Sequence, residues 1–377
     1  MKKICIYCER WASGGIESFL TSLLFHMDRS ACQIDLVASC MEESIFTKPL
    51  QELGISFYQL SGSRNRVLEN RSQFLKLLRE RNYDVLHVNA FHAGSFYFLH
   101  LGEKAGIPKR IAHAHNSGLR NGRLTAVKLA IHDWSKKKFV RNATDLWACS
   151  STAAEFMFSQ DSDIRNRVRL VPNGIDTRRF CFQPQRRQQV RAQLGMEASF
   201  VLGHVGRLSQ QKNQQFLLAV LKELIPHVPN SKLLLVGEGE LQQELKKQAA
   251  DLGLADKIHF AGPVSHVEDM LWAMDIFLFP SLFEGLGIAA VEAQAAGLPV
   301  LCSDKVPPEA QLLSTLSALP LEADAQLWAE KIQTVRETPV CREDCAELVR
   351  QKGYDMDDVA RMALKLYQGE PAAEGKR

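Results

Sequence analysis

The sequence predicts an α/β fold of two doubly wound domains that face each other across a cleft. Its 377 residues fit two domains of ordinary size. Hydrophobic residues make up 46% and charged residues 24% of the chain, as in an ordinary globular protein. In both halves, short apolar runs alternate with helical patterns, which is typical of parallel sheets covered by helices.

The first domain is expected to span residues 1–172. Seven short apolar runs are predicted to be its strands, at 3–8, 34–38, 55–60, 85–89, 110–115, 145–149 and 168–171. An amphipathic helix is predicted between the first two strands. Its apolar positions lie on one helix face and are Ile16, Phe19, Leu20, Leu23, Leu24 and Met27.

The second domain is expected to span residues 173–354, where short apolar runs again alternate with helical patterns. Its strands are predicted at 200–205, 232–236, 257–260, 275–279 and 300–302, and its helices at 213–225, 240–252 and 287–296. The turn sequence PNGID at 172–176 and a Gln- and Arg-rich stretch at 183–193 predict a linker and an entry helix. In doubly wound domains, ligands bind at the carboxyl ends of the strands.

Composition also indicates a cytoplasmic protein. The nine cysteines are scattered and odd in number, which favours reduced, buried thiols over disulfide bridges. No apolar run approaches the roughly 20 residues that a membrane-spanning helix needs. The first residues are expected to form a strand and not a signal peptide.

Charge is distributed unevenly between the two halves. Residues 1–172 carry 24 Lys and Arg against 16 Asp and Glu, a net charge of +8, whereas residues 173–377 carry 22 against 27, a net charge of −5. A basic half predicts contact with an anionic surface or substrate. The basic residues do not cluster with aromatics as in a nucleic-acid groove, so an anionic membrane or lipid substrate is favoured.

One segment, residues 124–140, combines this basic charge with apolar side chains. Val127, Ile131 and Trp134 alternate there with Lys128 and a run of three lysines at 136–138. Such a helix can lie on an anionic membrane. A helix that turns its apolar side to the core and its basic side to solvent is an equally good interpretation.

The strongest motif, at residues 279–292, reads FPSLFEGLGIAAVE. A predicted buried strand runs into a glycine-rich turn that opens a helix. Gly285 and Gly287 let the backbone approach a ligand, and the N–H groups at the helix start, around Leu286 and Ile288, favour an anion. Two carboxylates, Glu284 and Glu292, flank that anion site. The alternative is that Glu292 is a solvated helix residue.

A second motif, HVGRLSQQKN at residues 204–213, follows the first strand of the second domain. After Gly206, Arg207 and Lys212 are two fixed cations five residues apart at a strand end. Together they can bind a diphosphate. The planar guanidinium of Arg207 can donate two parallel hydrogen bonds to its oxygens, and the ammonium of Lys212 can supply a compact positive charge. The alternative is two surface charges on a loop.

Two further candidates lie in the first domain. The sequence SGGIE at 13–17 places Gly14 and Gly15 after the first strand, but it lacks the third glycine of GxGxxG, which disfavours a dinucleotide-binding enzyme. A plain tight turn is its alternative interpretation. His115 ends a predicted strand, with His113, His87 and His92 as weaker candidates; a lone histidine is more often structural.

Taken together, these motifs resemble those of nucleotide-sugar glycosyltransferases of the GT-B fold, specifically the retaining enzymes of family 4. The matching patterns are Glu-seven residues-Glu, GRLxxxKN, the GG loop and the turn VPNGxD, and they are densest at 173–303. The sequence is most similar to bacterial enzymes of capsule and exopolysaccharide assembly, whose acceptors are commonly lipid-linked sugars on the inner membrane face.

The resemblance implies a role for each domain. Residues 1–172 would be a Rossmann-like acceptor domain and residues 173–354 a Rossmann-like domain for a nucleoside-diphosphate sugar, expected to be UDP-linked. Residues 355–377 would form a helix that crosses back to the first domain, and a tail. The partners would be that sugar donor, a glycan or lipid-linked acceptor and, peripherally, an anionic membrane, with no nucleic acid.

The resemblance also implies roles for the candidate residues. Arg207 and Lys212 would hold the donor diphosphate, Glu284 the sugar hydroxyls and Glu292 the ribose hydroxyls. The GG loop would lie over the donor phosphates and sugar, and His115 near the reaction centre. Backbone groups around Val264 would read the base. The reaction would retain the anomeric configuration by front-face attack and would need neither metal nor cofactor.

Other interpretations of the sequence remain open or are weak. A nucleotide-sugar epimerase of the same fold would need no acceptor, and a non-catalytic GT-B subunit would support another transferase. The D-x-D sequence at 161–163 is expected to be a solvated loop. Cys5 and Cys8 spell C-x-x-C, but strand alternation would point their thiols to opposite faces. No Cys/His cluster has zinc spacing.

Overall fold

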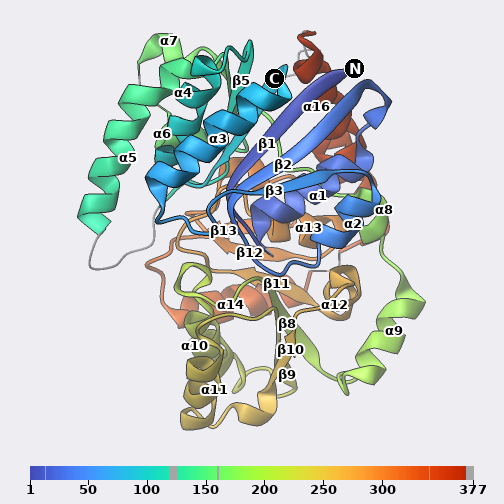
Figure 1. The fold of residues 1–377 in the computed structure, drawn as a ribbon. Coiled ribbons are helices and arrows are strands. Elements are labelled where there is room, and N and C mark those ends of the chain that lie inside the picture. The colour runs from blue at the N-terminus through green and yellow to red at the C-terminus, as the bar shows by residue number, and fades with distance from the viewer. Residues whose placement is uncertain (13, 119–124, 159–160, 339, 371–377) are drawn as a thin grey trace. The chain divides into compact units, whose positions relative to one another are not determined.

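The computed structural model describes residues 1–12, 14–118, 125–158, 161–338 and 340–370 (Figure 1). The chain divides into two compact units. Unit 1 consists of residues 1–174 together with the segment that begins at Asp355, and unit 2 of Ile175–Tyr354. Each unit contains one parallel sheet with helices packed against it, which confirms the predicted α/β fold class.

Unit 1 contains a seven-stranded parallel sheet in the order β3-β2-β1-β4-β5-β6-β7. The strand order reverses between β1 and β4; Ile4 of β1 pairs with Ile34 of β2 on one side and with Val85 of β4 on the other. All seven strands predicted from the sequence are present. Their bounds are β1 Lys2–Trp11, β2 Cys32–Met41, β3 Ser56–Gln59, β4 Val85–Ala90, β5 Lys109–Ala114, β6 Asp145–Ala148 and β7 Val168–Leu170.

Helices pack on both faces of this sheet. Ile4 and Ile6 point to one face, where they join a core that includes residues of α1 and α16. Tyr7 points to the other face and stacks on Phe98, with ring centroids 4.0 Å apart. The helices of unit 1 are α1 Gly15–His26, α2 Thr47–Glu52, α3 Val67–Arg81, α4 Tyr97–Lys104, α5 Thr125–Phe139, α6 Ser151–Met157, α7 Ser162–Arg165 and α16 Met356–Gln368.

Unit 2 contains a six-stranded parallel sheet in the order β10-β9-β8-β11-β12-β13. Its strands are β8 Phe200–Val205, β9 Ser231–Val236, β10 Ile258–Gly262, β11 Ile276–Phe279, β12 Val300–Ser303 and β13 Leu316–Leu319. The first five were predicted. The strand β13 was not, because its four residues, LSAL, are too few to show a pattern and form a strand by pairing with β12.

Helices of unit 2 surround its sheet in the same way. Leu217 and Leu221 of α10 and Trp328 of α14 are fully buried in one core with the strands. Burying each such side chain contributes roughly 1.5–3 kcal/mol. The helices are α8 Thr177–Phe180, α9 Pro184–Gln193, α10 Gln214–Leu224, α11 Gln242–Asp251, α12 Val267–Ala273, α13 Ile288–Ala295, α14 Ala325–Arg336 and α15 Cys345–Val349.

One local expectation was wrong. The D-x-D sequence at 161–163 is not a loop, because Ser162 begins the short helix α7 and Asp161 precedes it as the N-cap residue. Asp161 and Asp163 are nevertheless exposed. Across the described residues, no group of three or more His, Cys, Asp or Glu side chains is arranged to hold a metal ion.

Candidate functional site

The carboxyl ends of β8 and β11 lie side by side at the point where the strand order of unit 2 reverses. In doubly wound sheets the crevice outside such a switch point is the usual ligand site. The segment after β8 contains Gly206, Arg207 and Lys212, and the segment after β11 contains Glu284. The fold therefore brings the two strongest sequence motifs to one place.

Hydrogen bonds join the two segments directly. The backbone N–H of Leu282 donates to the carbonyl of Gln211 over 2.8 Å. The Gln211 side-chain amide donates to the Phe283 carbonyl over 3.0 Å, and the Asn213 amide donates to the Pro280 carbonyl over 3.3 Å. The sequence analysis assigned no role to Gln211 or to the Asn213 side chain. Their bonds fix the distance between the two charged motifs.

Lys212 and Glu284 meet across this junction. The Lys212 Nζ lies 2.7 Å from the Glu284 Oε1, and both side chains are largely withdrawn from solvent. Nζ also lies 4.7 Å from the centroid of the Phe279 ring. A β-carbon on Gly206 would lie 3.4 Å from Cε of Lys212, so this glycine packs against the lysine side chain.

The helix α13 begins beside this ion pair. Gly287 precedes it with φ +93° and ψ 53°, a left-handed conformation that favours glycine. A β-carbon there would lie 3.1 Å from the Phe279 ring. The first turn of α13 therefore starts at Ile288, directly after Gly287, and its N–H groups and dipole favour an anion beside Lys212.

Arg207 lies at a more exposed position. Its Nε lies 3.0 Å from Oε2 of Glu240, and both side chains are exposed. Two glycines that the sequence analysis missed shape the loop that carries it. A β-carbon on Gly237 would lie 2.3 Å from the Gly206 carbonyl oxygen, and one on Gly239 would lie 2.2 Å from that of Leu208. The signal for them was the GEG sequence that follows β9.

Glu292 lies on α13 with a half-buried side chain. Desolvation raises the pKa of its carboxyl to about 7, helped by the charge of Glu268 and opposed by those of Arg179 and Lys212. Arg179 of α8 is itself held by Glu268 of α12, with 2.8 Å between Nη2 and Oε2. A freely solvated helix carboxylate would not have this environment. Neither Arg179 nor Glu268 was predicted from the sequence, because neither belongs to a recognisable motif.

Val264 follows β10, which is the edge strand beyond β9. Its side chain is half-buried. The end of β10 is bonded to the loop after β9, because the Gly237 N–H donates to the Gly262 carbonyl over 2.8 Å. Val264 and Arg207 therefore both lie at the carboxyl end of the unit 2 sheet, after β10 and β8.

Gly14 and Gly15 lie at the carboxyl end of β1 in unit 1, and Ser13 lies outside the described residues. Gly14 is the N-cap residue of α1. A β-carbon on it would lie 2.7 Å from the carboxylate of Glu17, which itself accepts a hydrogen bond from the Ala12 N–H over 3.2 Å. The buried carboxylate of Glu17 thus packs against Gly14 and bonds to the backbone of Ala12.

His115 follows β5 and is buried. Its Nε2 lies 2.9 Å from Oδ1 of Asn89, and its Nδ1 is buried with no hydrogen-bond partner. Burial lowers the pKa of His115 to about 3. The ring is therefore neutral near pH 7, and it can exchange hydrogen bonds but carries no charge.

The other candidate histidines differ from one another. His87 connects the Tyr367 hydroxyl, 2.7 Å from its Nδ1, to Nδ1 of His113, 3.1 Å from its Nε2. These two rings belong to the packing between the sheet and α16. His92, after β4, instead forms an ion pair with Glu9, with 2.7 Å between Nε2 and Oε2.

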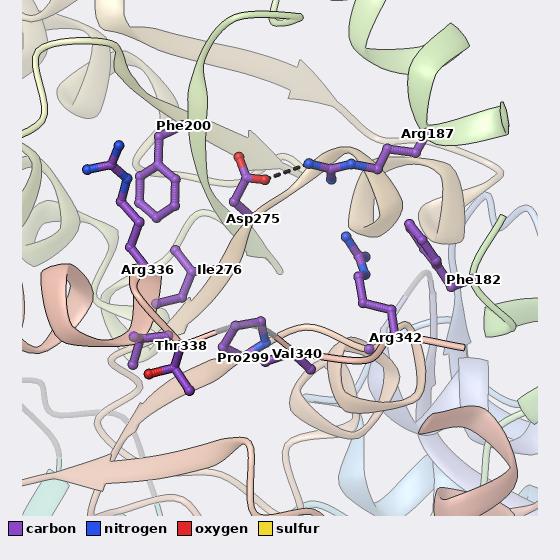
Figure 2. A pocket seen from close by; sticks show the side chains of 12 residues that line it. Phe182, Arg187, Phe200, Asp275, Ile276, Pro299, Arg336, Thr338, Val340 and Arg342 are labelled. Atoms are coloured by element: carbon purple, nitrogen blue, oxygen red, sulfur yellow. Dashed lines mark hydrogen bonds and ion pairs between the residues drawn. The ribbon is translucent and has the colours of Figure 1, made fainter. Parts of the chain in front are cut away.

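A separate pocket of about 330 Å³ lies at the opposite end of the unit 2 sheet (Figure 2). Phe200 and Ile276, at the amino ends of β8 and β11, form part of its wall. Arg187 pairs with Asp275 over 2.5 Å. Arg187 and Arg342 also donate to the Met274 carbonyl, just beyond α12. These arginines stabilise a helix end, and none of the predicted site residues lines this pocket.

Two family models match the chain. The model described as "Glycosyltransferase Family 4" matches residues 13–179, and the one described as "Glycosyl transferases group 1" matches residues 186–352. Within the described residues, no helix has the length and apolar character to cross a membrane.

Similar proteins support the same assignment. A putative glycosyltransferase, EpsF, from Bacillus subtilis is 30% identical over 359 residues, covering 94% of this chain and 93% of that protein. A UDP-Gal:alpha-D-GlcNAc-diphosphoundecaprenol alpha-1,3-galactosyltransferase from Escherichia coli is 27% identical over 280 residues, 72% of each chain. The crystal structure of Alr3699/HepE from Anabaena in complex with UDP-glucose superposes with a TM-score of 0.80 at 21% identity, over 98% of this chain and 100% of that one.

Proposed function

The chain belongs to glycosyltransferase family 4, and we propose that it moves a sugar from a UDP-sugar to a glycan or lipid-linked acceptor in surface polysaccharide synthesis, with retention of the anomeric configuration. The family membership makes it a glycosyltransferase of the GT-B type. The choice of donor, acceptor and stereochemical course is the proposal.

The observation that carries the proposal is the position of Lys212 beside the start of α13. Breaking a sugar–phosphate bond leaves a nucleoside diphosphate whose negative charge grows as the bond lengthens. A fixed ammonium and the N-terminal dipole of α13 at one switch point provide stabilisation for that charge. Arg207, at the exposed rim, would bind the phosphate farther from the sugar.

These groups also explain why no metal ion is proposed as a cofactor. Divalent cations serve such reactions by neutralising the leaving diphosphate. Here Lys212, Arg207 and the N–H groups of residues 285–288 would supply positive charge and hydrogen bonds for the same purpose.

The two carboxylates would orient the donor. Glu284 lies in the turn, so it is proposed to accept hydrogen bonds from the sugar hydroxyls while its bond to Lys212 holds it in place. Glu292 lies one turn along α13 and is proposed to accept hydrogen bonds from the ribose hydroxyls. Backbone groups around Val264, on the same sheet edge, are proposed to read the base.

Unit 1 would supply the acceptor side. Gly14 and Gly15 are proposed to cover the donor phosphates and sugar, and His115 to offer its neutral Nδ1 to a sugar hydroxyl near the reaction centre. Retention would follow from attack on the face from which the diphosphate departs, and the departing phosphate oxygen would take the acceptor proton.

The relatives support the donor and the acceptor class. The structurally similar HepE was crystallised in complex with UDP-glucose, and the Escherichia coli relative is named for a UDP-galactose donor and a diphosphoundecaprenol acceptor. For this chain we accordingly propose a UDP-linked donor and a lipid-linked acceptor. The protein would then work in the cytoplasm, peripherally on the inner face of the plasma membrane.

A donor screen tests the proposal. Purified protein is incubated with a panel of UDP-, GDP- and ADP-sugars, and nucleotide release is measured with and without added lipid-linked sugar. We expect slow release of UDP from one UDP-sugar, faster with acceptor, and an α-linked product from an α-linked donor. Release from a GDP- or ADP-sugar alone, inversion, or isomerisation of the donor without transfer would contradict the proposal.

A further inference from the structure

The helix α5 presents an apolar face that unit 1 does not cover. Val127, Ile131 and Trp134 are each more than half exposed, at 55%, 54% and 54%. They are spaced four and three residues apart, so they form one stripe along the helix. Single exposed apolar residues are ordinary, but a stripe that includes a tryptophan indicates an interaction surface.

The side of α5 that faces the protein is a different one. His132 accepts a hydrogen bond from the Ala93 N–H over 3.2 Å, and its other ring nitrogen lies 3.0 Å from the Phe156 carbonyl. Phe139 is buried edge-on against Tyr97. One side of α5 is therefore packed against unit 1, and the apolar stripe lies on another side, which does not belong to the core.

Basic side chains border the stripe. The Lys138 Nζ lies 4.7 Å from the centroid of the Trp134 ring, and Lys128 and Lys137 are exposed. Lys136 does not belong to this set, because its Nζ donates to the Phe156 carbonyl. The helix carries a single acidic residue, Asp133.

From these observations we infer that the face formed by Val127, Lys128, Ile131, Trp134, Lys137 and Lys138 docks on an anionic lipid bilayer. Apolar side chains inserted between headgroups and lysines on anionic headgroups are the two contributions that hold an interfacial helix. A second copy of this chain fits the face less well, because both faces would bring the same net positive charge. The inference deepens the proposed function, from which it takes the membrane contact.

The position of α5 in unit 1 indicates which end of the unit 1 sheet would lie near the bilayer. The helix lies at the periphery of unit 1 (Figure 1), and Lys128 is close enough to His92 to act on its charge. His92 follows β4 at the carboxyl edge of the sheet, where doubly wound folds bind ligands, and Phe91 beside it is also exposed. A bilayer on α5 would thus present a lipid-linked acceptor next to that edge.

Vesicle binding of the full-length protein tests the inference. The vesicles are pure phosphatidylcholine or an equimolar mixture with phosphatidylglycerol. We expect binding to the anionic vesicles that weakens as salt rises, since screening acts over about 8 Å at physiological salt. The double variant Lys137→Glu/Lys138→Glu should lose at least about fivefold in partitioning per lysine. The double variant Ile131→Ser/Trp134→Ser should lose binding at every salt concentration.

Matched controls lie on α3 of the same unit. Leu68→Ser and Lys76→Glu change side chains that are also exposed, and both variants should bind vesicles like the parent. Parental binding by the α5 variants, or equal partitioning into neutral and anionic vesicles, would overturn the inference. It would also be overturned if the α5 variants converted a lipid-free dimer to a monomer without changing lipid binding.

Affinity for UDP separates this inference from the proposed function. The α5 variants should bind UDP like the parent, because none of the substituted residues is in the proposed donor site. If the protein bound anionic vesicles through α5 but released no UDP from any UDP-sugar, the docking would stand and the proposed reaction would fail.

Discussion

The ammonium of Lys212 and the carboxylate of Glu284 form an ion pair 2.7 Å long, although 72 residues separate them in the sequence. The pair joins the loop after β8 to the loop after β11. Removing one partner of a buried pair leaves the other charge uncompensated. In the proposed reaction the pair therefore holds the lysine ready for the diphosphate and the glutamate ready for the sugar.

Replacing Lys212 or Arg207 with Ala should reduce transfer by roughly 10²–10³-fold each, the usual scale for losing one preorganised stabiliser of developing charge. Comparison of kcat/KM between the parent and each variant checks this. Lys247→Ala, on the exposed side of α11, is the control and should be without effect. Near-normal turnover of both site variants would remove the diphosphate assignment.

Substitutions of Glu284 and Glu292 should have different effects on the affinity for UDP. Glu284→Ala should impair turnover but leave UDP affinity intact or increase it, because UDP has no donor sugar and Lys212 loses its carboxylate partner. Glu292→Ala should weaken UDP binding by about 1.5–3 kcal/mol, the range for a hydrogen bond to a charged group. Calorimetry with UDP measures both. Parental affinity in Glu292→Ala would make that residue structural.

The raised pKa of Glu292, about 7, predicts a pH dependence. In the proposed site, ionised Glu292 would accept hydrogen bonds from the ribose hydroxyls, so UDP affinity should rise as pH increases through 7. Glu292→Gln should bind UDP more weakly and without that rise. A parental binding curve that is flat from pH 6 to pH 8 would contradict the assignment.

The same carboxyl predicts the opposite trend in stability. Its pKa is higher in the folded than in the unfolded chain, so its contribution to stability is complete below the unfolded pKa and is lost as pH rises through 7. Glu292→Gln should therefore be more stable than the parent at pH 8 and similar at pH 5. Chemical denaturation at the two pH values, without ligand, measures the difference.

His115 should act without changing its charge. Its pKa, lowered to about 3 by burial, keeps the ring neutral across the working range. His115→Ala should slow transfer, while the pH profiles of parent and variant should have the same shape between pH 5 and pH 8. An inflection near pH 6.5 that only the parent shows would mean that the ring is protonated during the reaction.

Transfer should persist in the presence of a chelator, because Lys212, Arg207 and the start of α13 are proposed to stabilise the leaving group. Product formation is measured with EDTA and then after adding back manganese or magnesium. Loss of activity in EDTA and its return with either ion would overturn the metal-independent mechanism.

Much of the fold was determined by local sequence patterns. Short apolar runs identified twelve of the strands, and apolar side chains that recur every three to four residues identified helices such as α1. The glycine-rich turn at 285–287 could also be predicted locally, since the left-handed backbone at Gly287 favours glycine. The family resemblance, confirmed by both family models, rests on these same short segments.

Tertiary structure alone decided which of these segments meet. Strand order places β8 beside β11, so it brings Lys212 to Glu284, and Gln211 and Asn213 then bond the two loops together. Likewise, the sequence of α5 allowed either a core-facing or a surface stripe, and the packing of His132 and Phe139 left Val127, Ile131 and Trp134 outside. Such choices depend on contacts between residues far apart in the chain. A local pattern fixes which side chains share a face, but only packing determines what that face meets.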